Sequence, residues 1–325
     1  MVKNSVLKGV FLVALGATSY GMLATFVKMA YGEGYTTAEI TFSQFAFGII
    51  GMLLINLFLK KKNNNSAKKA SKKNISQLIL AGSSTGLTSI FYYLAVKFNI
   101  PVSIAIVLLM QTVWMGVLLE MILEKKLPST LKIISVIIVL LGTALATNLI
   151  NSSTNLNLLG IFFGLLAAAS FTTTMFTANS IATHISSAQR SLYMLFGGGI
   201  LVLIFTLITQ IIPAQSESFN HMMGIFSTPK DFNFMIFAKW AIVLSLFGTI
   251  IPPLLLNAGF PLTGIGLGSI VSSLELPVSV LMAFFLLHEH VAFSQWIGII
   301  LIITAIVVMN LKKKNEVVPE VINEA

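Results

Sequence analysis

The chain has 325 residues, of which 56% are hydrophobic and 10% are charged, and its mean hydropathy is +0.92. Because a soluble domain carries about 25% charged residues, this composition excludes a soluble globular protein and indicates an integral membrane protein. The net charge of +9 does not indicate nucleic-acid binding, because the lysines lie between apolar stretches, where they act as orientation signals. The absence of cysteine excludes disulfides and thiolate metal sites.

Apolar stretches separated by polar segments predict ten membrane-spanning helices, since about 20 apolar residues cross a hydrocarbon core of about 30 Å. The basic, apolar N-terminus also resembles a signal peptide, but it lacks a small-residue cleavage site, so we expect an uncleaved first span. Segments 60–73 and 213–233 are expected as polar loops, and 312–325 as a cytoplasmic tail. The expected spans are Val6–Ala30, Ala38–Leu59, Ile75–Lys97, Pro101–Leu123, Ser129–Ile150, Leu158–Ala182, Ser191–Ile212, Phe237–Phe260, Ile265–His288 and Phe293–Leu311.

Ten spans place both termini on one side of the membrane. If that side is the cytoplasm, 16 lysine and arginine residues lie inside and four lie outside. Because cytoplasmic loops are enriched in lysine and arginine, the sequence predicts cytoplasmic termini in a multi-pass protein of the cell membrane.

The sequence contains two related halves. Residues 104–129 align with 269–294 at an offset of 165, and residues 7–19 align with 158–170 at an offset of 151. We therefore predict two repeats, 6–150 and 158–311, of five spans each. Because five is odd, the repeats cross the membrane in opposite directions, a plan common in transporters whose site lies near the midplane.

Glu275 lies near the middle of the ninth expected span, two residues before Pro277. A charged group at mid-membrane costs about 2.5 kcal/mol or more, so such an acid marks a function or a buried partner. Burial favours the neutral form of a carboxylic acid, which suits a proton-coupled step. The alternative is a structural acid bonded to a neighbouring helix. Lys28 is either its counter-charge or a side chain that extends to the membrane surface.

Two prolines in the eighth span, Pro252 and Pro253, predict a hinge. They cannot donate to the carbonyls of Gly248 and Thr249, which stay free if they face protein or a cavity. Asn257 lies one turn further on and is a candidate substrate residue. The alternative is a kink that serves packing alone.

Gln111 and Trp114 share a face of the fourth span and suit an amphipathic solute. The alternative is an interhelix hydrogen bond beside an interfacial anchor. Tyr20, Gln44 and Tyr92 are further candidate substrate residues.

Other polar groups give no sign of catalysis. His288 and His290 lie on different helix faces and lack the HExxH spacing, so we predict no metal site. Glu120 and Glu124 are expected to form a solvated face. The sequence has no phosphate loop, nucleophile elbow or paired catalytic carboxylates, and it predicts neither an enzyme nor a cofactor.

Two five-helix halves, each ending in an acidic turn and a last apolar helix, resemble the EamA branch of the drug/metabolite transporter superfamily. The pair Tyr20–Gly21, followed by Lys28, matches the pattern of the family's first span. Glu275 and Glu289 keep the spacing of the acids in its ninth span. The resemblance implies a basket of helices around a central cavity, lined mainly by spans one, three, four, six, eight and nine. It also implies export of metabolites, amino acids or drugs.

The sequence departs from the family pattern at several positions. Pro277 falls one place late, and His288 replaces a glycine. Met110 and Thr112 stand where the first half of the pattern has glutamate and proline, and Gln44 stands where arginine is frequent. These departures bear on the identity of the solute.

We therefore predict an all-α membrane protein with ten spans in two inverted repeats around a central cavity. Its predicted function is export of a small organic solute by alternating access, driven by a proton gradient or by the solute gradient. A nutrient importer with the same fold is one alternative, and a membrane scaffold or sensor without a transport cycle is another. The expected partners are the solute and the lipid bilayer, with no nucleic acid, and no oligomeric state is predicted.

Overall fold

The computed structural model describes residues 2–62, 70–98, 102–147, 157–288 and 290–313. Within these residues all regular secondary structure is helical, as the composition predicts. Glu289 lies outside the described residues, as do the centre of the 60–73 segment, most of the expected boundary between the repeats and nearly all of the expected tail.

Eight helical segments of the described chain are long and apolar enough to cross a membrane. Two further apolar segments are shorter over the residues whose side chains the structure describes: α6 (Thr130–Ala146), and Phe293–Met309 within α16 (Phe293–Lys313). All ten expected segments are thus helical, and eight of them reach membrane-spanning length. These eight are α1 (Val2–Gly32), α2 (Thr37–Lys62), α3 (Lys72–Lys97), α4 with α5 (Val102–Leu109, Thr112–Glu124), α7 (Leu158–Ser180), α8 to α9 (Ser187–Thr206, Ile212–Gln215), α12 to α13 (Ala241–Ser245, Ile251–Thr263) and α14 with α15 (Ile265–Ser272, Glu275–Leu286).

The fourth and ninth expected spans are each interrupted near the middle. In the ninth, Pro277 has no backbone N–H to donate to the carbonyl of Ser273, and a short turn separates α14 from α15. In the fourth, the side-chain amide of Gln111 donates to the carbonyl oxygen of Val107 at 3.0 Å. Its own backbone N–H would use that acceptor in an α-helix. Because the side-chain N–H of Gln111 takes the place of its backbone N–H, the backbone hydrogen bonding is interrupted at this point, between α4 and α5.

The two prolines of the eighth span follow a π-helical turn, η4 (Leu246–Ile250). In a π-turn each backbone N–H bonds to the fifth preceding carbonyl rather than the fourth. The carbonyl that Pro252 leaves without a donor is therefore that of Phe247, one residue before the predicted Gly248. The hydroxyl of Ser19 donates to the Phe247 oxygen at 3.1 Å, so a side chain of the neighbouring helix α1 supplies the hydrogen bond that Pro252 cannot.

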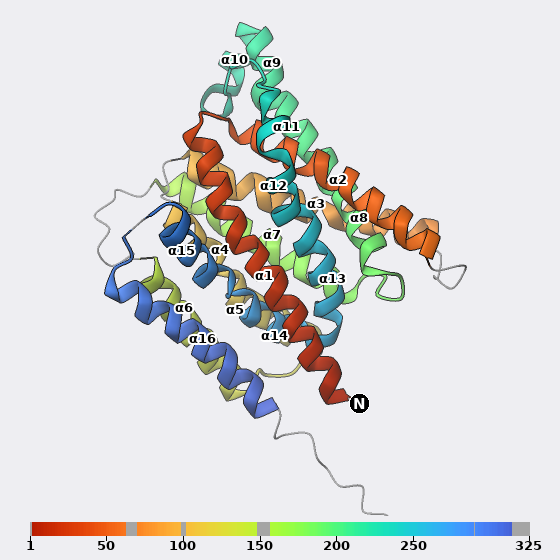
Figure 1. Ribbon diagram of the computed structural model, residues 1–325, viewed down its shortest axis with the longest axis vertical. Helices are drawn as coiled ribbons and strands as arrows, with labels where there is room; N and C mark the ends of the chain where they lie inside the picture. Colours follow the sequence, from red (N-terminus) through yellow and green to blue (C-terminus); the bar gives the residue numbers. More distant parts are fainter. Residues whose placement is uncertain (1, 63–69, 99–101, 148–156, 289, 314–325) are drawn as a thin grey trace, which may run out of the picture.

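The helices form a bundle with two ends (Figure 1). We call one end the terminal face: it holds the start of α1 and the turns after α5, α7 and α13. The other end, the loop face, holds the turn between α1 and α2 and the short elements α10 (Glu217–Met223), η3 (Gly224–Phe226) and α11 (Met235–Lys239). Within the bundle, α1 packs along α13, α7 along α3, α2 along α8, α6 along α16, and α5 along α14.

Buried polar groups hold the loop face together. Glu39, at the start of α2, is fully buried, and its carboxylate accepts hydrogen bonds from the Gln210 side chain at 2.9 Å and from the backbone N–H of Asn233 at 2.7 Å. Lys97, at the end of α3, donates to three oxygen atoms of residues 226–228. The loop after α8 is therefore fastened to the ends of α2 and α3.

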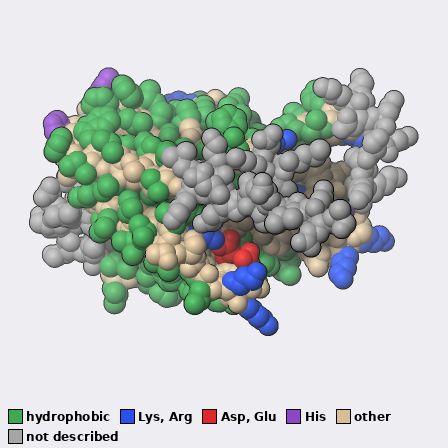
Figure 2. Space-filling view, turned by 90° about the horizontal axis from the view of Figure 1, so that it is seen from below, with side chains coloured by type: hydrophobic (Ala, Val, Ile, Leu, Met, Phe, Trp, Pro, Cys, Tyr) green, Lys and Arg blue, Asp and Glu red, His purple; other side chains and the backbone are tan. Residues whose placement is uncertain are grey.

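Large hydrophobic side chains cover much of the surface. Phe58 and Leu80 are 71% and 75% exposed. Figure 2 shows that hydrophobic side chains dominate the described surface seen from below, and that charged groups are confined to small areas. Such a surface suits contact with lipid. The chain is a multi-pass membrane protein.

Candidate functional site

A cavity of about 90 Å³ lies among α1, α2, α3, α4, α7, η4 and α15. It extends from Tyr20 and Glu275, in the middle of the bundle, toward the loop face, where Lys28 and Tyr31 line it. A cavity must have a volume of about 10–15 Å³ to hold one water molecule, so this cavity has room for several waters or for a small solute.

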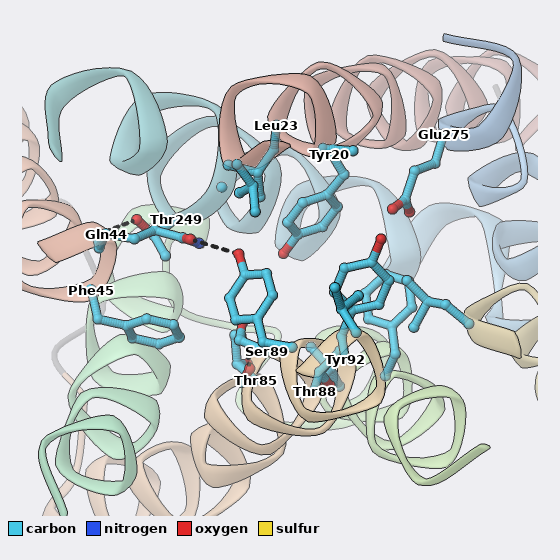
Figure 3. A pocket seen from close by; sticks show the side chains of 18 of the residues that line it. Tyr20, Leu23, Gln44, Phe45, Thr85, Thr88, Ser89, Tyr92, Thr249 and Glu275 are labelled. Atoms are coloured by element: carbon cyan, nitrogen blue, oxygen red, sulfur yellow. Dashed lines mark hydrogen bonds between the residues drawn. The ribbon is translucent and has the colours of Figure 1, made fainter. Parts of the chain in front are cut away.

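Glu275 enters this cavity from the interruption between α14 and α15. It is the first residue of α15, and Figure 3 shows its carboxylate pointing into the space beside Tyr20 and Tyr92. No described residue donates a hydrogen bond to this carboxylate. The close approach of α1 depends on Gly21, where a methyl group would overlap the carbonyl of Glu275. The absence of a side chain at Gly21 therefore brings Tyr20 beside the acid.

Four tyrosines, Tyr20, Tyr31, Tyr92 and Tyr93, line the cavity, and we call them the tyrosine cage. Tyr93 packs edge to face against Tyr92 and Tyr31, with ring centroids 5.7 and 6.4 Å apart. Tyr20 packs edge to face against Phe171 at 5.9 Å. Edge-to-face pairs fix ring orientation, so the cage is a rigid aromatic wall.

Gln44 joins this wall to the π-turn. Its side-chain oxygen accepts from the Tyr93 hydroxyl at 3.3 Å, and its backbone oxygen accepts from the Thr249 hydroxyl at 3.0 Å (Figure 3). Gln44 is 2% exposed, so its amide presents little surface to a solute. In this arrangement Gln44 orients Tyr93 and η4.

Helix α3 supplies the polar side of the cavity, which was not predicted from the sequence. Thr85, Thr88, Ser89, Tyr92 and Val96 all line it. Their spacing of three, four, seven and eleven residues from Thr85 follows one face of an α-helix, and a search for polar helical periodicity in this span could have found it. The hydroxyl of Thr85 is buried and has no hydrogen-bond partner among the described residues.

Asn257 lies below the main cavity, toward the terminal face. It lines a smaller cavity of about 10 Å³, which shares Tyr20 and Thr85 with the larger one. Its side-chain amide donates to the Ser191 hydroxyl at 2.9 Å, and its backbone carbonyl accepts from the guanidinium of Arg190 at 2.6 Å. The side-chain oxygen of Asn257 is buried without a described partner. Pro253 lines the same small cavity, and Pro252, the preceding residue, is buried.

Gln111 and Trp114 do not line either cavity. The Trp114 indole N–H donates to the Gln111 side-chain oxygen at 2.9 Å, and Trp114 is 38% exposed on the outside of the bundle. The two residues share a helix face, as their spacing predicts, but that face points away from the tyrosine cage. The structure thus brings together Tyr20, Gln44, Tyr92 and Glu275 and separates them from Gln111 and Trp114.

A charged cluster lies at the terminal face. Glu120 of α5 accepts hydrogen bonds from Lys132 of α6 and from the backbone N–H of Gly266, at the start of α14. The expected solvated face is therefore wrong for Glu120, which connects three helices, whereas Glu124, one turn further on, is exposed. The cluster ties α5 to α14 on the side opposite the opening of the cavity.

Comparisons with known proteins agree with this architecture. A model of the EamA-like transporter family matches residues 7–148 and again residues 158–311. No curated protein matches the chain. Several solved structures match; one of them, described as the crystal structure of a protein, has a TM-score of 0.71 and 13% identity over 97% of this chain and 98% of that chain, which shows a shared fold. Because the family model matches most of the sequence in two consecutive stretches, the chain belongs to the EamA-like transporter family.

Proposed function

We propose that this protein exports a small organic solute across the cytoplasmic membrane by alternating access. Membership of the EamA-like family makes it a membrane transporter of the drug/metabolite type. The observation that carries the finer proposal is the central cavity, which contains Glu275 and reaches toward the loop face. Below the cavity, the Glu120 cluster is proposed to hold the terminal face closed, because it joins α5, α6 and α14.

Two inverted repeats, 6–150 and 158–311, are the proposed framework for this cycle. Under such a repeat, the first and sixth spans are equivalent, as are the third and eighth. The packing of α1 on α13 then has its counterpart in the packing of α7 on α3. The interruptions between α4 and α5 and between α14 and α15 also fall at nearly equivalent positions. These correspondences support a site between two repeats that rock against each other.

The terminal face is proposed to be cytoplasmic, since 16 of the 20 lysine and arginine residues fall on that side in the predicted topology. The cavity then faces outward in this conformation. The π-turn before Pro252 and Pro253 is the proposed hinge, because it joins α1, through Ser19, to the wall of the cavity.

Glu275 is proposed to carry a proton in the cycle. An acid that accepts no hydrogen bond from a described residue and lies in a cavity can ionise when water enters and become neutral when the cavity closes. Tyr20 and Tyr92 flank the carboxylate, and Lys28 lies nearer the loop face.

The test begins with identification of a solute by metabolite profiling of medium from overexpressing and deletion strains. Uptake of that solute into inside-out vesicles is then measured with and without an imposed pH gradient. If Glu275 carries the proton, the gradient accelerates uptake by the unmodified protein and not by Glu275→Gln. Glu33→Gln, a change at an exposed loop acid, serves as the control and keeps the response.

Other outcomes separate the alternatives. Equal acceleration of both proteins would contradict the proton role of Glu275. No acceleration of either indicates a facilitator in which the acid orients the solute. A growth requirement in the deletion strain, without accumulation of a metabolite inside the cells, indicates import. The absence of movement of any solute indicates a scaffold or sensor.

A further inference from the structure

The chemistry of the central cavity restricts the charge of its solute. Glu275 is the acidic residue among the described residues that line the cavity, and Lys28 is the basic one. The two lie at different depths. Gly21 contacts the backbone of Glu275, and Lys28 follows seven residues later, which is about 10 Å along α1. The exposed side chain of Lys28 therefore belongs to the entrance, and the carboxylate to the interior.

Among the described residues, no cationic side chain lines the interior of the cavity to pair with an anionic solute. Arg190, the large cation buried below the cavity, donates to the backbone carbonyls of Thr177, Ala178, Ile181 and Asn257 at 2.5–3.1 Å. Its guanidinium is thus occupied in joining the C-terminal end of α7 to the middle of α13. Among the described residues, the cationic side chain that lines the cavity is Lys28, and it lies at the entrance of the tyrosine cage.

The interior instead matches a cation. A positive charge over the face of a tyrosine is attracted by the ring quadrupole, and several aromatic walls around one carboxylate are the usual receptor for an ammonium group. The cage supplies four tyrosines on two helices, and Glu275 supplies the counter-charge between Tyr20 and Tyr92 (Figure 3). Without a described hydrogen-bond donor, the carboxylate remains available to a ligand.

We infer that the solute carries a positively charged amine or quaternary ammonium group, which binds between Glu275 and the tyrosine cage. Its uncharged part lies against the apolar side of the cavity, formed by Leu23, Val27 and Leu109. On α3, the hydroxyl of Thr88 already donates to the carbonyl of Ser84 and accepts a hydrogen bond from a polar substituent, whereas the hydroxyl of Thr85, without a partner among the described residues, can donate or accept one. This inference rests on the proposed function, because it assigns the solute of the same cavity.

The test is calorimetric binding to the purified full-length protein in lipid nanodiscs. The probes are choline, tetraethylammonium and phenethylamine, together with dimethylbutanol, the uncharged carbon isostere of choline. Because choline and its isostere share one shape, the comparison isolates the charge and requires no variant. We expect the cations to bind and the isostere to bind more weakly by on the order of tenfold or more.

Two variants locate the binding. Glu275→Gln should lower the affinity for the cations by on the order of tenfold and leave that for the isostere unchanged. Tyr92→Phe keeps the aromatic face and should bind nearly as well as the unmodified protein, whereas Tyr92→Leu should lose affinity for the cations. Trp114→Leu, outside the cavity, is the control for a general aromatic effect.

The inference is overturned if none of the three cations binds, if choline and its isostere bind equally, or if Glu275→Gln leaves the affinity for the cations unchanged. Failure of the proposed function has a different signature: cations bind to the cavity, but vesicles move no solute. Vesicles that move only neutral or anionic solutes, without cation binding, retain the proposed function and contradict the inference.

Discussion

The hydroxyl of Ser19 donates a hydrogen bond to the carbonyl oxygen of Phe247 at 3.1 Å, across the contact between α1 and the π-turn η4. That carbonyl lacks its backbone donor because Pro252 has no N–H. Ser19→Ala should therefore leave a buried acceptor unsatisfied and destabilise the protein by about 1–3 kcal/mol. Thermal unfolding in detergent measures the effect. Ser83→Ala, which removes only a bond to Leu80 in the same helix, should change stability little.

Close packing of α3 on α8 gives a second prediction. A methyl group at Gly197 would overlap the backbone carbonyl of Ile79, and neither helix can move away without separating from its neighbours. We expect Gly197→Ala to lower the free energy of unfolding by about 1–3 kcal/mol. Gly32→Ala is the matched control, because a methyl group there meets nothing within 4 Å. A similar loss in both variants would contradict the packing.

The Glu120 cluster should control access from the terminal face. Glu120→Gln removes the charge that holds Lys132 and weakens the contact with Gly266, so α5 and α14 should separate more often. The reporter is Ser269→Cys, since Ser269 is buried between these helices and the chain has no native cysteine. We expect Glu120→Gln to raise its labelling by an impermeant maleimide several-fold. Glu124→Gln, at an exposed position on the same helix, should leave labelling unchanged.

The position of the aromatic residues distinguishes two possible sites. Tyr20 lines the cavity and Trp114 faces outward, so Tyr20→Ala should weaken binding of the transported solute and Trp114→Ala should not. Loss of a buried aromatic wall is worth about 1.5–3 kcal/mol, or roughly 10- to 150-fold in affinity. Binding measurements on folded variants decide the matter, and the opposite ranking would move the site to α5.

Topology is directly testable because every introduced cysteine is unique. With a cytoplasmic terminal face, Lys126→Cys should react with an impermeant reagent only in inside-out vesicles. Asn220→Cys, on the loop face, should react only in intact cells. Reversed labelling would invert the orientation and, with it, the direction in which the cavity opens.

Much of the fold was predictable because apolar length and loop charge are local properties. Every expected span is helical where the structure describes it. The interruptions were less accessible. The interruption between α4 and α5 depends on a hydrogen bond from the Gln111 side chain, which the hydrophobic periodicity of the sequence does not indicate. The π-turn η4 moved the free carbonyl by one residue.

The site was predictable only where one residue is chemically unusual in its setting. Glu275 stands out as an acid in an apolar span, and Tyr20 follows from the family pattern, so the sequence predicts both as candidates, and both line the central cavity. Helix rotation decides the rest: Trp114 shares its face with Gln111 but turns outward, whereas Thr85 and Thr88 turn inward. The direction in which a polar helix face points depends on packing between spans far apart in the sequence, and the local pattern of residues within one span does not determine it.

The π-turn amounts to one extra residue in the helix that ends at Thr263. Deletion of a single residue from Leu246–Ile250 would restore an ordinary α-helix and turn everything after it by about 100° relative to everything before it. Asn257 would then rotate away from Ser191, and its carbonyl away from Arg190, without any change in their own identity. The length of this short segment is thus itself a determinant of the site. A sequence that keeps every lining residue but has one residue fewer in this segment would place different side chains below the central cavity.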